Sequence, residues 1–148
     1  MSRIVVGFDG SPAAEAALAV AVEEAQLRKL PLRIVCTWEV PPLEYAGVAF
    51  APAPDYNDAA KQHADTVLAA VAGKVAGSGV EVEAVAISGH AASVLLEEAK
   101  DAKLLVVGTR GRSTLKGLVL GSVSQALAHH CPTPLLIVPA PRGGDTHE

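Results

Sequence analysis

Apolar residues follow two alternating patterns along this chain. Short runs in which most positions are apolar are typical of β-strands, and longer stretches with apolar residues about every 3.6 positions are typical of helices that cover a core. Strands are therefore expected at residues 4–8, 32–38, 80–87, 104–107 and 135–138, and helices at residues 12–29, 55–76, 91–102 and 122–130.

Particular residues mark where two of these helices begin. Ser11 can cap the first helix, and Pro12 takes its first position, where the N–H that proline lacks would have no partner anyway. Ser122 is followed three positions later by Gln125, which fits a capping box at the start of the last helix. The first helix is therefore expected to begin near Pro12 and the last near Ser122.

Two of the expected strands differ in how they should be buried. Residues 80–87 alternate between apolar and polar positions, which predicts one solvated face and a place at the edge of a sheet. Residues 104–107 are wholly apolar, as expected for a strand covered on both faces. Together these patterns predict a sheet with an exposed edge and a buried interior.

Strands that alternate with helices predict parallel pairing in a single doubly wound α/β sheet with helices on both faces. Ligands of such sheets bind beyond the carboxyl ends of the strands, where the strand order reverses. Three segments are expected there, at residues 9–11, 37–40 and 108–122. The proline-containing loop at residues 39–54 is interpreted either as a lid or as slack chain.

Length and composition support one globular domain and narrow its partners. The chain has 148 residues, of which 50% are hydrophobic and 19% charged, which excludes intrinsic disorder. Only 3% are aromatic, so the core should be aliphatic, and flavin binding or base stacking is disfavoured. A net charge of −4 argues against a nucleic-acid partner. Residues 1–141 are expected to form the domain, and the polar residues 142–148 a disordered tail.

The apolar runs are too short to cross a membrane, and no signal peptide is recognisable, so no membrane partner and a cytoplasmic location are expected. The two cysteines, Cys36 and Cys131, do not make a disulfide framework. Cys36 should be a small buried apolar residue. His129 and His130 precede Cys131 on a helix, where neighbouring side chains diverge, so a structural zinc site is not expected.

The segment from Gly108 to Ser122 carries the strongest candidate chemistry. Its spacing is Gly108, two residues, Gly111, nine residues, then Gly121 and Ser122. Glycines let the backbone approach a ligand closely, and the free N–H groups at a helix N-terminus attract anions. The N–H groups of residues 122–124 and the hydroxyls of Ser122 and Ser124 are the expected donors, with Arg110, Arg112 and Lys116 nearby. This combination suits a di- or triphosphate.

Plainer interpretations of these residues remain open. Ser122 could cap only its own helix, the glycines could serve loop geometry, and Asp9 could organise the turn through Gly10. His90 is expected to do no more than begin a helix. A lysine directly before Ser or Thr, as in a P-loop, is absent, as is the dinucleotide-binding glycine pattern after the first strand.

The chain resembles the universal stress protein family over nearly its whole length. The resemblance rests on VVGFDGS at residues 5–11, LVVGTRG at residues 105–111, LGSVS at residues 120–124 and CPTPLLIVP at residues 131–139. The glycine spacing matches the motif of the ATP-binding subgroup without a gap. The resemblance implies a Rossmann-like five-stranded sheet with strand order 3-2-1-4-5, and a dimeric stress-response module that binds ATP with Mg²⁺ or Mn²⁺.

The resemblance also implies roles for individual residues. Gly7 and Asp9 would lie against the nucleotide, with Asp9 near the ribose or a phosphate-bound metal, and the backbone of Thr37 would contact adenine. The ribose and inner phosphates would be lined by Val107, Gly108, Arg110 and Gly111. The terminal phosphates would be held by Gly121, Ser122, Val123 and Ser124. Many members have a histidine where this chain has Cys36, which puts the adenine pocket in question.

Binding is favoured over catalysis, because the expected site offers serines and Asp9 but no histidine that could act as a base. A slow ATP hydrolase or phosphotransferase, and a member that binds AMP or cyclic AMP, are the alternatives. A response-regulator receiver is excluded, since Ile87-Ser88 and Pro139 stand where it needs an aspartate and a lysine.

The last strand predicts how the protein assembles. Residues 135–138 are apolar on both faces and come last in the β/α order, so they should form an unprotected sheet edge. Pairing with the same strand of a second copy would satisfy its backbone, and a two-fold axis makes that pairing antiparallel. A homodimer is expected, with contacts from Leu135, Leu136, Ile137 and Val138. The resemblance implies the same arrangement.

Overall fold

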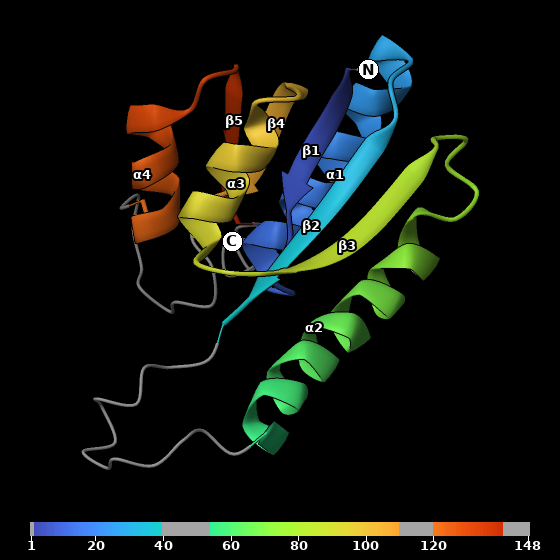
Figure 1. The fold of residues 1–148 in the computed structure, drawn as a ribbon. Helices are drawn as coiled ribbons and strands as arrows, with labels where there is room; N and C mark the ends of the chain where they lie inside the picture. The colour runs from blue at the N-terminus through green and yellow to red at the C-terminus, as the bar shows by residue number, and fades with distance from the viewer. Residues whose placement is uncertain (1, 40–53, 110–119, 141–148) are drawn as a thin grey trace, which may run out of the picture.

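The structure, a computed structural model, describes residues 2–39, 54–109 and 120–140. Strands and helices alternate along these residues (Figure 1). The strands are β1 (Arg3–Gly7), β2 (Leu32–Trp38), β3 (Val82–Ser88), β4 (Ala102–Gly108) and β5 (Leu135–Val138). The helices are α1 (Pro12–Arg28), α2 (Pro54–Val75), α3 (Ala91–Ala99) and α4 (Ser122–His130). The predictions for residues 40–53, 110–119 and 141–148 lie outside the described residues.

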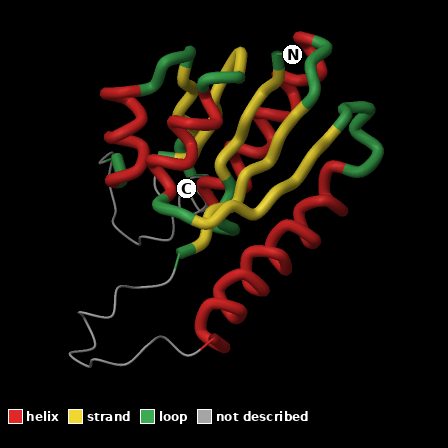
Figure 2. The backbone as a smooth tube through the Cα atoms, in the orientation of Figure 1, coloured by secondary structure: helices red, strands yellow, loops and turns green. Residues whose placement is uncertain are grey.

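The strands form one parallel sheet in the order β3-β2-β1-β4-β5. This is the predicted doubly wound, Rossmann-like α/β fold with order 3-2-1-4-5. The strands make up the middle layer (Figure 2), with α3 and α4 in front of the sheet and α1 behind it in Figure 1. The strand order reverses between β1 and β4, so a crevice is expected at their carboxyl ends.

Helix α1 begins as the sequence predicts. The Oγ of Ser11 accepts a hydrogen bond from the N–H of Ala14 at 3.1 Å, and Pro12 is the first helical residue. The helix ends at Arg28, and the next residue, Lys29, adopts a left-handed conformation with φ 58° and donates its N–H to the carbonyl of Ala25. At the other end of α1, nearest the crevice, Ser11 therefore satisfies one of the N–H groups that would otherwise have no partner.

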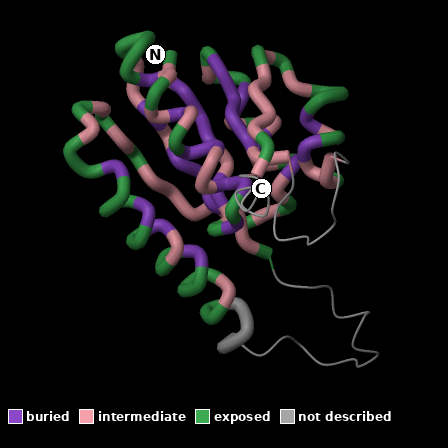
Figure 3. The backbone as a smooth tube through the Cα atoms, turned by 180° about the vertical axis from the view of Figure 1, so that it is seen from behind, coloured by how far each residue is buried: buried purple, intermediate pink, exposed green. Residues whose placement is uncertain are grey.

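Two aliphatic layers fill the space between the sheet and its helices. The larger lies under α1 and α2 and includes Ile4, Leu32 and Ile34, and the smaller lies under α3 and α4 and includes Leu105 and Leu127. Buried residues follow the inner strands and recur singly along the face of α2 that meets the sheet (Figure 3). Among the described residues, no helix has both the length and the apolar character needed to span a bilayer.

The predicted boundaries of α3 and β4 were wrong by two or three residues. The pattern extended the helix to Ala102, but α3 ends at Ala99 and β4 already includes Ala102. The N–H groups of Lys100 and Asp101 turn back to carbonyls of the last helical turn, which tightens the chain. The carbonyl of Ala102 is then held by the hydroxyl of Thr133 at 3.0 Å. The tertiary bond from Thr133 is not visible in the local pattern.

Candidate functional site

A cavity of about 310 Å³ opens at the carboxyl ends of β1, β2 and β4. This volume lies at the lower end of the range of roughly 300–1,000 Å³ typical of small-molecule sites. Its lining is formed by Gly7, Phe8, Asp9, Ala14, Val35, Thr37, Leu95, Val107, Gly108, Gly121, Ser122, Val123 and Ser124. The cavity therefore lies at the switch point of the strand order, where the fold predicts a ligand.

The cavity has an apolar wall and a polar end. Val35, Leu95 and Val107 come from β2, α3 and β4 and belong to the smaller aliphatic layer. The polar end is the first turn of α4, where three backbone N–H groups face no acceptor within the helix. Among the described lining residues, Asp9 alone has an ionisable side chain. The site can thus bury an apolar group at one end and receive an anion at the other.

The first turn of α4 is not the predicted capping box. The N-cap is Gly121, with φ −72° and ψ 171°, and it has no side chain that could cap the helix. Its N–H donates to the carbonyl of Thr109 at 2.8 Å, which holds Gly121 extended and makes Ser122 the first helical residue. The amide of Gln125 donates instead to the carbonyl of Leu120 at 3.2 Å.

The hydroxyl of Ser124 joins the two halves of the glycine motif. It lies 2.6 Å from the carbonyl oxygen of Thr109 and 3.1 Å from that of Gly121, and Ser124 is only 2% exposed. Residues 109 and 121 are therefore held side by side at the rim of the cavity. The hydroxyl of Ser124 is engaged within the protein, so it is not the free ligand donor that the sequence suggested. Ser122 is exposed.

Asp9 combines the turn role with a place in the cavity. Its Oδ1 accepts the N–H of Ser11 at 2.9 Å, which organises the turn between β1 and α1. Its other oxygen, Oδ2, makes no hydrogen bond to any residue that the structure describes. A carboxylate oxygen at this position is a ligand that Mg²⁺ prefers. The turn interpretation and the ligand interpretation are therefore geometrically compatible.

Two glycines of the predicted site lie where neighbouring residues leave little room for a side chain. A Cβ on Gly108 would lie 2.6 Å from the Cβ of Ala13 and 2.9 Å from its backbone carbon, so α1 can approach β4 only over a glycine. A Cβ on Gly7 would lie 2.9 Å from Cδ1 of Leu95 on α3. Gly108 therefore sets how closely α1 approaches the sheet, Gly7 leaves room for the side chain of Leu95, and both line the cavity.

Nine of the predicted nucleotide-site residues come together in this cavity: Gly7, Asp9, Thr37, Val107, Gly108, Gly121, Ser122, Val123 and Ser124. Arg110 and Gly111 lie outside the described residues, as do Arg112 and Lys116. Sequence reasoning missed the lining residues Phe8, Ala14, Val35 and Leu95. Val35 is two positions before Thr37 on the same strand, so strand alternation would have placed it on the same face.

Cys36 lies on the other face of β2, away from the cavity. It is 5% exposed and packs in the larger aliphatic layer with Ile34 on the opposite side of the sheet from Val35. It is the buried apolar residue that was predicted. Its side chain is not part of the lining, so the departure from the family at this position does not alter the wall of the described cavity.

The histidines that the structure describes are also outside the lining. His90 is the N-cap of α3 as predicted, and its Nδ1 lies 3.5 Å from a carboxylate oxygen of Glu39. His129 and His130 end α4 and are exposed. Within the part of the chain that the structure describes, no three His, Cys, Asp or Glu side chains are grouped so that they could hold a metal ion.

A doubly wound parallel sheet with a cavity at its switch point is the architecture of a ligand-binding α/β domain. Comparison with known proteins narrows the class further. The chain belongs to the universal stress protein family, whose sequence profile matches residues 1–139. The predicted family is thereby confirmed.

Three proteins illustrate the similarity. Universal stress protein Rv2005c of Mycobacterium tuberculosis (strain H37Rv) is 36% identical over 140 residues, which are 90% of this chain and 44% of that protein. This chain thus spans about half the length of the curated relatives it matches. A universal stress protein solved in complex with cAMP superposes with a TM-score of 0.70 at 28% identity, over 95% of this chain and 98% of that one. The Archaeoglobus fulgidus protein in complex with dAMP gives 0.70 at 22% identity, over 93% and 98%.

Proposed function

We propose that this cavity binds an adenine nucleotide, that ATP with Mg²⁺ or Mn²⁺ is its ligand, and that the protein is a regulatory binding module. The observation that carries the proposal is the open N-terminus of α4. Gly121 supplies no cap, so the N–H groups of Ser122, Val123 and Ser124 are left for an anion at the cavity. By contrast, α1 at the same crevice is capped by its own Ser11.

The apolar wall suits the other end of a nucleotide. An adenine ring would pack against Val35 and Leu95, with the backbone of Thr37 available for its polar edge. The similar protein solved with cAMP, at 28% identity, supports an adenine nucleotide rather than a different anion that carries an apolar group. The glycine motif, including Arg110 and Gly111 as sequence positions, supports a ligand with more than one phosphate.

A divalent cation is proposed because the described part of the cavity lining is acidic. Asp9 is the ionisable side chain among the described lining residues, and it would face a polyphosphate of the same sign. A hard cation with oxygen ligands would relieve this repulsion by bridging Asp9 and the phosphates. The lining offers no histidine base within the described residues, so we propose slow hydrolysis at most.

Calorimetry on the purified full chain tests the proposal. ATP, ADP, AMP and cAMP are titrated with Mg²⁺ and again with EDTA, and any ligand carried through purification is released by acid and identified by mass spectrometry. ATP should bind most tightly, with affinity falling when the metal is removed. Tighter binding of AMP or cAMP would replace ATP as the ligand, and no binding of any of the four would overturn the proposed function.

A further inference from the structure

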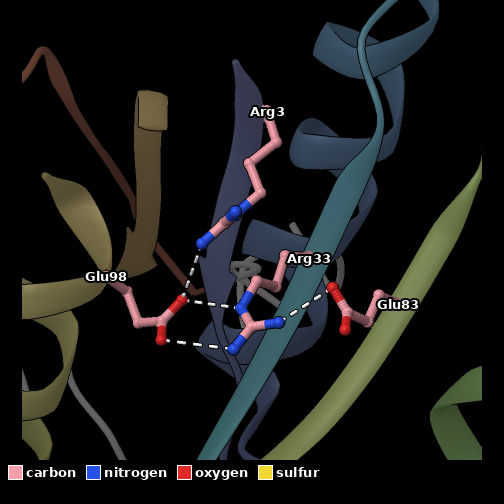
Figure 4. A network of polar contacts seen from close by, with 4 residues as sticks. All are labelled: Arg3, Arg33, Glu83 and Glu98. Atoms are coloured by element: carbon pink, nitrogen blue, oxygen red, sulfur yellow. Dashed lines mark hydrogen bonds and ion pairs between the residues drawn. The ribbon is translucent and has the colours of Figure 1, made fainter. Parts of the chain in front are cut away.

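Four charged side chains from four elements meet beneath α3 (Figure 4). Glu98 of α3 accepts two hydrogen bonds from Arg33 of β2, at 2.6 Å between Nε and Oε1 and 3.3 Å between Nη2 and Oε2. Arg3 of β1 adds a third to Oε1 at 3.3 Å. On its far side, Arg33 pairs with Glu83 of β3 at 2.8 Å. We call these four residues the Glu98 network.

The centre of the Glu98 network is shielded from solvent. The side chains of Arg33 and Glu98 are only 17% and 14% exposed, so salt screens their pair much less than a surface pair. Two parallel bonds between a guanidinium and a carboxylate also fix direction as well as distance. The bond to Glu98 raises the pKa of Arg33 above its already high ordinary value, so Arg33 stays charged at any physiological pH. The contact therefore ties α3 to the sheet in one geometry.

The apolar contacts of α3 rest on few fully buried side chains. Ala92, Leu95 and Ala99 are buried, and Val94 and Leu96 pack partly buried against the smaller aliphatic layer. Alanine buries little apolar area, and area determines how much burial stabilises, so Leu95 is the one large side chain of α3 that is fully buried. Glu98 adds directional bonds to these contacts, and both together determine where this nine-residue helix lies on the sheet.

Glu98 and Leu95 are one helical turn apart and face the same side. Residues at this spacing are neighbours on a helix surface. Leu95 lines the cavity and lies so close to β1 that a Cβ on Gly7 would be 2.9 Å from its Cδ1. A shift or rotation of α3 would consequently move the apolar wall of the cavity against β1.

We infer that Glu98 is a positioning residue for the ligand cavity, although it does not line it. Through its bonds to Arg33 and Arg3 it holds α3 in register with the sheet, and this places Leu95 at the distance from Gly7 that shapes the apolar wall. The inference deepens the proposed function, since it concerns how the base end of the nucleotide is held. It predicts that charges outside the cavity control affinity inside it.

The test compares Glu98→Gln with Glu97→Gln. Glu97 is the next residue on the same helix, is 73% exposed and pairs only with Lys100 among the described residues, so it is the matched control. Two quantities are measured: the methyl NMR shifts of Leu95 without ligand, and the affinity for ATP with Mg²⁺. In Glu98→Gln we expect the Leu95 methyls to shift and ATP affinity to fall about ten-fold. In Glu97→Gln neither should change.

A double variant separates positioning from general loss of stability. If Glu98 acts through Leu95, adding Glu98→Gln to Leu95→Ala should weaken ATP binding no further. An additive effect, or a Glu98→Gln protein with a lower melting temperature but unchanged Leu95 methyls and ATP affinity, would overturn the inference.

The inference can still be tested if Glu98→Gln does not fold or if the wild-type protein binds no nucleotide. If Glu98→Gln does not fold, Arg3→Gln keeps the paired bonds of Arg33 and should produce the same methyl shift on a smaller scale; no shift overturns the inference. If the wild-type protein binds no nucleotide, the proposed function fails, but the Leu95 methyls of the ligand-free variants still test the positioning by Glu98.

Discussion

Ser122 and Ser124 stand two positions apart on α4 but have different surroundings. Ser122 is exposed at the cavity, whereas Ser124 is buried and bonded to the carbonyl of Thr109. Ser124→Ala should lower the free energy of unfolding by about 1 kcal/mol, the usual net worth of one hydrogen bond. Ser122→Ala should change it by less than roughly 0.5 kcal/mol. Urea unfolding of both variants measures these free energies. Equal losses would contradict the inference that the hydroxyl of Ser124 holds residues 109 and 121 together.

Gly121 offers a direct test of the anion end. Its φ of −72° is open to any residue, so a side chain here causes no backbone strain. Gly121→Val would place a branched side chain beside the free N–H groups of α4, where the phosphates should approach. ATP affinity measured by calorimetry should fall at least about ten-fold, which is roughly one lost phosphate contact of 1.4 kcal/mol. Undiminished affinity in a folded variant would remove this end of the cavity from the site.

Asp9 can be tested so that its two roles separate. Asp9→Asn keeps an oxygen for the N–H of Ser11 but removes the charge, whereas Asp9→Ala removes both. The melting temperature should therefore stay near wild type in Asp9→Asn, while ATP affinity in Mg²⁺ falls towards the value measured in EDTA. If Asp9→Asn still responds fully to Mg²⁺, the carboxylate does not contact the metal.

At the scale of elements, the sequence predicted what local patterns determine. The order of strands and helices, the cap of α1 and the edge position of β3 are confirmed. The solvated face predicted for β3 was wrong, because Val85 and Ile87 pack against the smaller aliphatic layer on the face of Glu83. The start of α4 at Ser122 was predicted correctly, but its capping box was wrong, because Gly121 is held as the N-cap by a bond to Thr109, a residue far away in the chain. Leu95 was missed as a lining residue because its place depends on how α3 lies across the sheet. The N-cap of α4 and the place of Leu95 both depend on contacts between residues far apart in the chain, which a local sequence pattern does not contain.

Gly108 shows how one element depends on another. Its missing Cβ is what allows the first turn of α1 to pack against β4, since a Cβ at this position would lie 2.6 Å from the Cβ of Ala13. Gly108→Ala should therefore destabilise the fold by about 1–3 kcal/mol through overpacking. Adding Ala13→Gly should recover part of this loss, as seen in the urea midpoint. If Gly108→Ala keeps full stability but loses ATP binding, the glycine serves the ligand alone.

At the scale of the whole molecule, the two sheet edges differ. The edge strand β3 carries the exposed Glu83, while β5 has four half-buried apolar residues and no charge. Leu135 and Ile137 pack in the smaller aliphatic layer, on the side of α4, and Leu136 and Val138 pack in the larger layer, on the side of α1. Every side chain of β5 thus has a place in the monomer, so what this edge lacks among residues 2–39, 54–109 and 120–140 is a backbone partner.

We therefore predict that the homodimer forms through backbone pairing of β5. The carbonyls of Pro134 and Val138 accept hydrogen bonds from N–H groups of β4 and the residue after it, so by strand alternation the N–H groups of Leu135 and Ile137 point outward.

Sedimentation at micromolar concentration should give a dimer for the wild type. Ile137→Pro removes one outward N–H at an edge position that tolerates proline, and should give a monomer, whereas Ile137→Val keeps the N–H and should remain a dimer. Circular dichroism confirms that each variant is folded. A wild-type monomer would end the prediction, and an unchanged dimer in folded Ile137→Pro would assign the contact to another surface, because two-fold pairing of β5 needs that N–H on both copies.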